Sequence, residues 1–115
     1  MEVKARLTNY RVSAQKARLV ANEIRGKGVD EALMILDLSN KRFAKPLAKL
    51  VRSAVANAEE ANNRDRVGID IDNLLVKTIT VDQGSASWRI RARAQGRAAW
   101  IQHRTSHIQV FLNED

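Results

Sequence analysis

Five arginines in the last third of the chain are the residues whose type and spacing point most directly to a chemistry. Residues 83–113 contain no aspartate or glutamate. The first three of these arginines alternate with small or apolar residues, so in an extended chain their guanidinium groups share one face. A guanidinium can donate paired hydrogen bonds to a phosphate, and cations without carboxylates repel one another unless a polyanion binds them. The stretch therefore predicts a polyanion-binding arm. Its arginines are Arg89, Arg91, Arg93, Arg97 and Arg104.

The arm is expected to be a β-hairpin of about residues 84–104. A chain that goes out and returns must bend near residues 93–96, where Gly96 supplies the positive φ that such a bend needs. Trp88 and Trp100 are equally spaced about residue 94, which predicts that they lie roughly across from each other. Two strands alone are marginally stable in water, so we expect the arm to order against a partner. The alternative is a solvated, charged hairpin that serves solubility alone.

The expected third helix carries a second group of cations, on the side opposite its apolar stripe. They gather in its first turns, where the positive end of the helix dipole makes cations mildly unfavourable. The arrangement is favourable if phosphates dock on that half of the helix. The alternative is an ordinary solvated face. The residues are Lys41, Arg42, Lys45, Lys49 and Arg52.

The first expected helix and its end add four more basic residues. Arg18 and Arg25 are seven positions apart and share a side, with Lys16 and Lys27 nearby. This spacing fits further phosphate contacts, and it fits a solvated face equally well.

Catalytic and metal-binding patterns are weak. His103 and His107 have the spacing of a helical metal pair, but on a strand they would lie about 13 Å apart. Asp65, Asp70 and Asp72 lack the spacing of a calcium loop and are typical of a solvated turn. No Ser-His-Asp or Cys-His set can be assembled. We therefore expect no enzyme, no metal and no cofactor.

Hydrophobic periodicity supplies the framework. Alternation predicts strands at residues 2–8, 74–81 and 108–112, and helical stripes predict helices at residues 13–25 and 30–38 and a third helix whose apolar stripe covers residues 47–58. Ser13 is the expected N-cap of the first helix, and Pro46 lies near the start of the third. Residues 62–72 are expected to form a polar loop. The predicted fold class is α+β, with three helices on one face of a small antiparallel sheet and a long protruding hairpin.

Composition favours one basic domain over residues 1–115. The formal net charge is +7, the hydrophobic fraction is 44% and the aromatic fraction is 4%. The core must therefore be aliphatic, and the isoelectric point of about 10.4 favours nucleic acid as a partner. Cysteine is absent. The lack of apolar runs of signal-peptide or membrane-spanning length predicts a cytoplasmic protein that does not enter a membrane.

Several stretches resemble the bacterial large-subunit ribosomal protein L twenty-two family. They are RVSAQKARLV at 11–20, IRGK at 24–27, SAVANAE at 53–59, RARAQGRA at 91–98 and RTSHI at 104–108. The resemblance covers nearly the whole chain in order. The chain departs from the family at Trp88, where a basic residue is usual, at Ala92, where proline is usual, and at His103, where lysine is usual. The segment of residues 64–72 also departs.

The resemblance implies a structural protein that binds large-subunit ribosomal RNA and supports its assembly. Its hairpin would reach into the RNA, with Gly96 and the five arginines in contact and His107 at the base. The tip would line part of the nascent-peptide exit tunnel. Neighbouring ribosomal proteins and the nascent peptide would be its other partners, and it would be a monomer outside the ribosome. The tip residues are Trp88, Ile90, Arg91, Ala92, Arg93, Gln95 and Gly96.

Two competing functions fit the same residues. An architectural DNA-binding protein would insert arginines into the minor groove, with Trp88 or Ile90 as an apolar wedge. Such proteins are commonly symmetric dimers, and no apolar face is left over for a dimer here. An RNA-processing enzyme would need a charged catalytic cluster around His103 or His107, and the sequence does not supply one.

Overall fold

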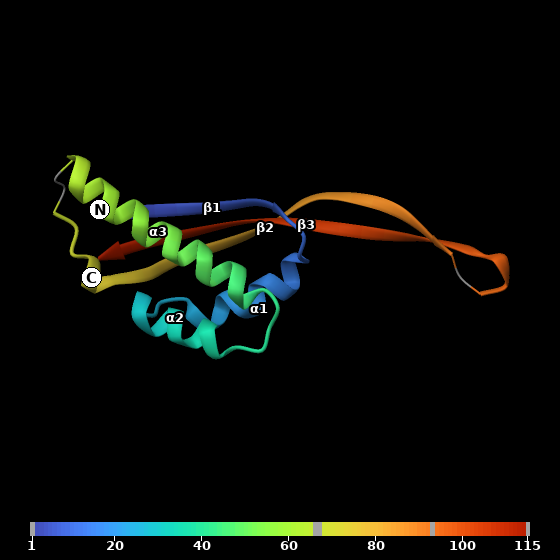
Figure 1. Ribbon diagram of the computed structural model, residues 1–115, viewed down its shortest axis with the longest axis horizontal. Helices are drawn as coiled ribbons and strands as arrows, with labels where there is room; N and C mark the ends of the chain where they lie inside the picture. Colours follow the sequence, from blue (N-terminus) through green and yellow to red (C-terminus); the bar gives the residue numbers. More distant parts are fainter. Residues whose placement is uncertain (1, 66–67, 93, 115) are drawn as a thin grey trace.

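The computed structural model describes residues 2–65, 68–92 and 94–114, which form a body and a long hairpin (Figure 1). The described part measures 64 × 27 × 16 Å. Its sheet has three antiparallel strands in the order β1-β3-β2. They are β1 (Glu2–Tyr10), β2 (Leu74–Ala92) and β3 (Ala98–Glu114). The central strand β3 therefore belongs both to the body and to the hairpin.

The hairpin begins where β1 ends. Tyr10 of β1 is opposite Ser106, whereas the pairing of β2 with β3 continues outward to Ala92 opposite Ala98. The predicted strands at 74–81 and 108–112 were too short, because the apolar alternation stops at the edge of the body while backbone pairing continues. The predicted α+β fold with a protruding hairpin is confirmed.

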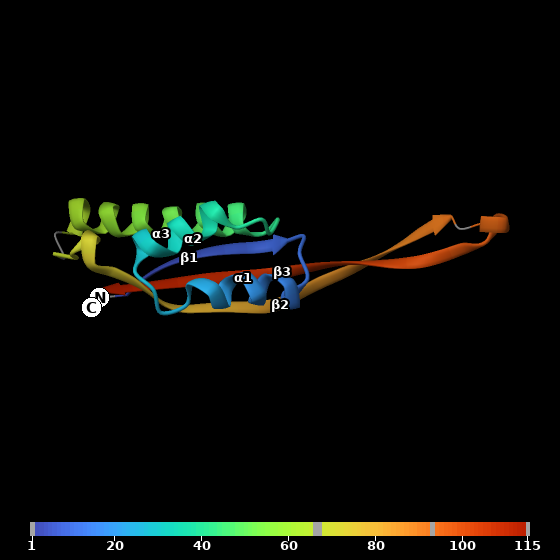
Figure 2. The same ribbon diagram turned by 90° about the horizontal axis from the view of Figure 1, so that it is seen from below.

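Three helices cover one face of the sheet (Figure 2). They are α1 (Ala14–Ile24), α2 (Val29–Leu38) and α3 (Ala44–Asp65). Helix α3 packs on β1 and β3, and α1 packs on β2. The oxygen of Ser13 accepts a hydrogen bond from the backbone N–H of Lys16 at 3.4 Å, which confirms the predicted cap. Pro46 lies in the first turn of α3, where its missing N–H costs no intrahelical hydrogen bond.

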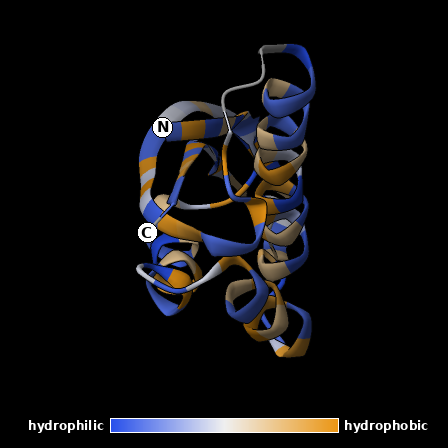
Figure 3. Ribbon diagram, turned by 90° about the vertical axis from the view of Figure 1, so that its left-hand side faces the viewer, coloured by the Kyte–Doolittle hydropathy of each residue, from blue (hydrophilic) through white to orange (hydrophobic). Residues whose placement is uncertain are grey.

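The core is aliphatic and lies between the helices and the sheet. The predicted stripes are buried: Ala17 and Ile24 of α1, Leu36 of α2, and Leu47 and Val51 of α3 are at most 1% exposed. Figure 3, which looks along the molecule, shows hydrophilic and hydrophobic residues alternating along the strands. This alternation places one set of strand side chains against the helices and leaves the other set on the open face.

The polar loop predicted for residues 62–72 is wrong in its first part, because α3 continues to Asp65. The side chain of Asn62 explains the difference. Its amide donates to the carbonyl oxygen of Ile69 at 2.7 Å and accepts from the Ile69 N–H at 2.8 Å. This pair of bonds folds the returning chain onto the helix and buries Ile69, which is 5% exposed. A short 3-10 turn, Ile71–Asn73, then leads into β2.

Gly84 lies at the base of the hairpin, where the pairing of β2 with β3 shifts register between Gln83 and Ala86. A Cβ at this position would lie 2.7 Å from Thr105 Oγ1 and 3.2 Å from the Thr105 carbonyl oxygen. The hydroxyl of Thr105 donates to the carbonyl of Ser85 at 2.5 Å, so it cannot rotate away without losing that bond. Close approach of the strands therefore requires glycine here.

We expect Gly84→Ala to destabilise the protein by about 1–3 kcal/mol, because a methyl group would be forced into a filled space. Denaturant unfolding followed by circular dichroism measures this change. In a Thr105→Ala background the same substitution should cost clearly less, since the nearest clashing atom is gone. An equal cost in both backgrounds would contradict the packing explanation.

Candidate nucleic-acid interface

The two faces of the hairpin carry different chemistry. Strand register places Arg89 opposite Ile101 and Arg91 opposite Ala99, and both arginines are exposed on the same face. The prediction that alternating arginines share a face is confirmed for this pair. Arg93, the third member and a predicted tip residue, lies outside the described residues. Arg104 is opposite Ala86 and belongs to the other face.

The two tryptophans lie near the predicted arrangement, but they are not a directly opposed pair. Trp88 is opposite Gln102, and Trp100 is opposite Ile90. The turn is not centred on residue 94, because it uses Ala94–Gly96 and the last pair is Ala92 with Ala98. The tryptophans still share one face, as diagonal neighbours.

The turn itself matches the predicted position. Gly96 has φ +72°, as expected, and Gln95 has φ 61°, a left-handed conformation that is uncommon for a residue with a side chain. The N–H of Arg97 donates to the carbonyl of Ala94 at 3.4 Å. Two consecutive left-handed residues reverse the chain and leave Gln95, Gly96 and Arg97 exposed at the tip.

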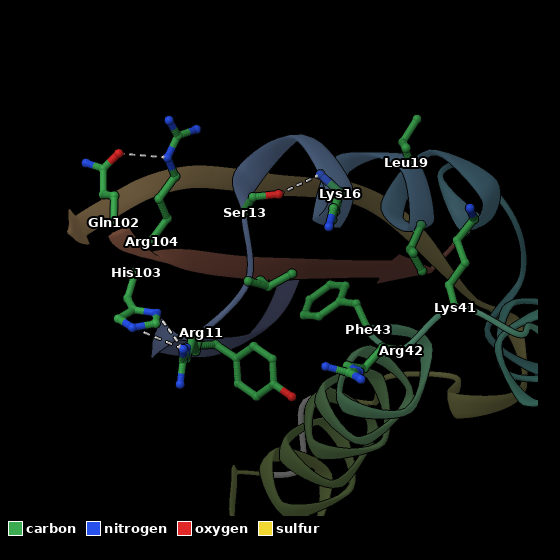
Figure 4. A pocket seen from close by; sticks show the side chains of 13 residues that line it. Arg11, Ser13, Lys16, Leu19, Lys41, Arg42, Phe43, Gln102, His103 and Arg104 are labelled. Carbon is green, nitrogen blue, oxygen red and sulfur yellow. Dashed lines mark hydrogen bonds between the residues drawn. The ribbon is translucent and has the colours of Figure 1, made fainter. Parts of the chain in front are cut away.

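A hollow of about 790 Å³ lies at the base of the hairpin. It is bordered by the segment before α1, by α1 itself, by the segment before α3 and by the part of the hairpin strand β3 that lies nearest the body (Figure 4). No acidic residue lines it, and the N-terminal ends of α1 and α3 add the positive ends of their dipoles. The lining cations are Arg11, Lys16, Lys41, Arg42 and Arg104.

The floor of this hollow is apolar. The rings of Tyr10 and Phe43 are in contact, with centroids 5.7 Å apart and planes at 54°. Val12 and Val20 also line the hollow, as does Leu19, which is 54% exposed. A cationic rim around an apolar floor suits a nucleic-acid strand, because phosphates can contact the rim while a base or sugar covers the floor.

The cations predicted on the third helix are exposed as expected. Lys41 and Arg42 precede α3 and border the hollow, and Lys45 and Lys49 follow on the exposed side of the helix. No ion pair joins these four to an acidic residue within the described residues. Arg52 differs, because its guanidinium lies 3.3 Å from a carboxylate oxygen of Asp37 in α2.

The basic residues of α1 and of the segment that follows it have roles in the fold that the sequence did not reveal. Arg18 donates to the carbonyl of Val81 at 2.9 Å, and Arg25 donates to the carbonyl of Ile79 at 2.7 Å. Both acceptors lie on β2, an edge strand whose outward polar groups would otherwise be open to pairing. Lys27 lies 3.9 Å from Glu31. Of this set, Lys16 lines the hollow.

His107 also has a role in the fold. Its Nδ1 accepts a hydrogen bond from the backbone N–H of Asn9 at 3.2 Å, at the irregular end of β1 where Asn9 has φ 55°. The ring also lies under Gly84, so His107 holds the hairpin base together. Contact between this residue and RNA stays a prediction.

His103 lies at the edge of the hollow and accepts a hydrogen bond from Arg11. Desolvation of the ring lowers the pKa of His103 below its ordinary value, and the positive charges of Arg11, Arg89 and Arg91 lower that pKa further. At neutral pH the ring is therefore neutral, which fits its role as an acceptor. No group of three or more potential metal ligands gathers anywhere in the described ranges.

Sequence reasoning missed Arg11, Tyr10 and Phe43. Arg11 was visible as a cation beside the Ser13 cap, but nothing in the sequence states that the starts of α1 and α3 meet at one end of the body. Among the helices described here, none is long and apolar enough to cross a bilayer.

The environment of His103 predicts how its ionisation responds to mutation. Arg11→Met should raise the pKa of His103, because it removes both a nearby positive charge and a donor to the neutral ring. Since the chain has two histidines, an NMR titration of the ring protons resolves them readily. Arg6→Met, on β1, is the matched control and should leave the value unchanged. An unchanged or lower pKa in Arg11→Met would contradict the assigned contact.

Sequence comparisons relate the chain to a known protein family. The chain matches the family described as Ribosomal protein L22p/L17e over residues 5–113. It is 53% identical over 114 residues to the large ribosomal subunit protein uL22 of Bdellovibrio bacteriovorus, with 99% of each chain covered. It is 50% identical over 108 residues to uL22 of Anaeromyxobacter sp. strain K, covering 94% of this chain and 71% of that protein. The chain therefore belongs to the Ribosomal protein L22p/L17e family.

Proposed function

We propose that this protein is a structural constituent of the large ribosomal subunit that binds large-subunit ribosomal RNA and supports its assembly. Its relatives carry the name large ribosomal subunit protein. The observation that carries the proposal is the hollow at the hairpin base, where five cations and two helix N-termini meet without a carboxylate. The positive charge of this surface attracts phosphate groups, and the residues that line it include no recognisable catalytic arrangement.

The cations of α3 extend the same surface along the body. Lys45 and Lys49 continue from Lys41 and Arg42 on the exposed side of the helix. Lysines that form no ion pair in the described part of the chain can contact phosphates as point charges, so they would position the protein and read little sequence. The body would thus anchor on the RNA by charge and shape. Outside the ribosome the protein would be a monomer. It would assemble into the large subunit in the cytoplasm, beside neighbouring ribosomal proteins.

The hairpin would be inserted among RNA strands and would reach the wall of the nascent-peptide exit tunnel. Support comes from its length beyond the body, its lack of acidic residues and its narrow two-stranded form. Phosphates would neutralise its arginines, and the exposed tip at Gln95 and Gly96 would face the nascent peptide.

Reversing charges on α3 should weaken RNA binding. We expect Lys45→Glu with Lys49→Glu to reduce the slope of log affinity against log salt by roughly 0.7–0.9 for each lost phosphate contact. Filter binding to a large-subunit RNA transcript at several salt concentrations measures this slope. Lys77→Glu is the control, because Lys77 lies on β2 and is paired with Glu2 at 3.3 Å. If the slope equalled that of the unmodified protein, the claim that α3 contacts RNA would be contradicted.

Placement of the tip in the tunnel predicts contact with nascent peptide. A photo-reactive residue at position 95 should crosslink to the peptide in stalled ribosomes, whereas the same residue at position 77 should not. Electrophoresis of the crosslinked products identifies the partner. Crosslinks from position 95 to RNA alone would argue against a tunnel-lining tip and would leave RNA binding intact.

A further inference from the structure

The hairpin has an apolar face that the arginines do not explain. Trp88, Ile90 and Trp100 lie on this face, and their side chains are 57%, 63% and 66% exposed. Three large apolar side chains gathered on a strip of two strands form a patch, and such patches on soluble proteins mark binding sites. Nothing within the described part of the chain covers them.

The spacing of the two indoles suits a flat ligand. Because Trp88 is opposite Gln102 and Trp100 is opposite Ile90, the tryptophans are diagonal neighbours on adjacent strands. Diagonal neighbours lie about 7–8 Å apart. This separation is about twice the 3.4 Å rise between stacked bases, which is what two rings need to hold one base between them. The high exposure of both rings is consistent with an open slot.

The positively charged residues near the patch favour an anionic ligand. On β3 the row Trp100, Gln102 and Arg104 leads from the patch to the cationic hollow, and Arg104 Nε donates to Gln102 Oε1 at 3.2 Å. The opposite face carries Arg89 and Arg91. An acidic peptide would satisfy the charge but would not use two flat rings, whereas a nucleotide uses both.

We propose that the face formed by Trp88, Ile90 and Trp100 binds an unpaired base of RNA, held between the two indoles while its flanking phosphates contact Arg104 and the rim of the hollow. This site rests on the proposed RNA-binding function and adds to it a preference for single-stranded RNA. Stacking on aromatic rings tolerates any base, so the preference is for an unpaired nucleotide and not for a sequence.

Tryptophan fluorescence tests the site directly, because both tryptophans of the chain lie in it. The full-length protein is titrated with single-stranded oligoadenylate and with an RNA duplex of the same length. The expected result is strong quenching by the single strand and little quenching by the duplex, although both bind through phosphates.

Conservative variants separate stacking from general apolar contact. Trp100→Leu and Trp88→Leu should each weaken binding of the single strand, by roughly 5- to 150-fold. Trp100→Phe and Trp88→Phe should retain most of the affinity, since they keep a ring. Leu38→Ala, which changes a still more exposed apolar residue on α2, should have no effect. The salt slope should be unchanged throughout, because no charge is altered.

The outcomes distinguish this site from the function on which it rests. Salt-dependent binding without quenching, or leucine variants that bind like the unchanged protein, would overturn the base site and leave RNA binding in place. If the unmodified protein bound neither the single strand nor the duplex, both the base site and the proposed RNA-binding function would be overturned. A change in tryptophan emission with protein concentration alone, accompanied by a dimer in sedimentation, would assign the face to a second copy of the chain.

Discussion

The function of this protein depends above all on one interaction, the repulsion among the cations of the hairpin. The two strands that carry these cations have no hydrophobic core of their own. Beyond Gly84 the hairpin has two strands, both faces exposed and no acidic side chain. Arg89 and Arg91 are two positions apart on one face, about 7 Å. That distance is within the screening length of about 8 Å at physiological salt, so their repulsion is felt. A polyanion would neutralise such a strip, and burial among phosphates would also supply the contacts that the hairpin lacks.

Strand β3 connects this strip to the body. Its inner half is buried between β1 and β2, and its outer half forms the hairpin. Buried Ser106 marks the junction, where its hydroxyl donates to the carbonyl of Val12 at 2.7 Å. Together with the tight contact at Gly84, this bond holds the segment before α1 against the hairpin base. In the proposed complex, the cations on the rim of the hollow would therefore approach RNA already positioned by these contacts.

Much of this arrangement could be read from the sequence, because it depends on local patterns. Periodicity located every helix, and the run without acids located the hairpin. What could not be read depends on contacts between distant residues. Asn62 extends α3 by bonding to Ile69, and the turn at Gln95 shifts the register that separates Trp88 from Trp100.

In the candidate site, too, some features follow from local sequence patterns and others depend on contacts between distant residues. Exposed lysines of α3 were predicted from helical geometry alone. The roles of Arg18 and Arg25 were not, because the carbonyls that they contact belong to a strand more than fifty residues away. Arg11 was missed for a similar reason: its place in the hollow depends on how α1, α3 and β3 come together. Charge composition predicts the kind of partner, and tertiary structure decides which cations meet it.

Sedimentation of the tagged protein through a sucrose gradient of dissociated ribosomal subunits tests the central claim most directly. The account predicts that the protein travels with the large subunit, and that replacing Arg89, Arg91, Arg97 and Arg104 with glutamine moves a folded protein to the top of the gradient. An unmodified protein that stays at the top, or a variant lacking these four arginines that remains bound equally well, would contradict it.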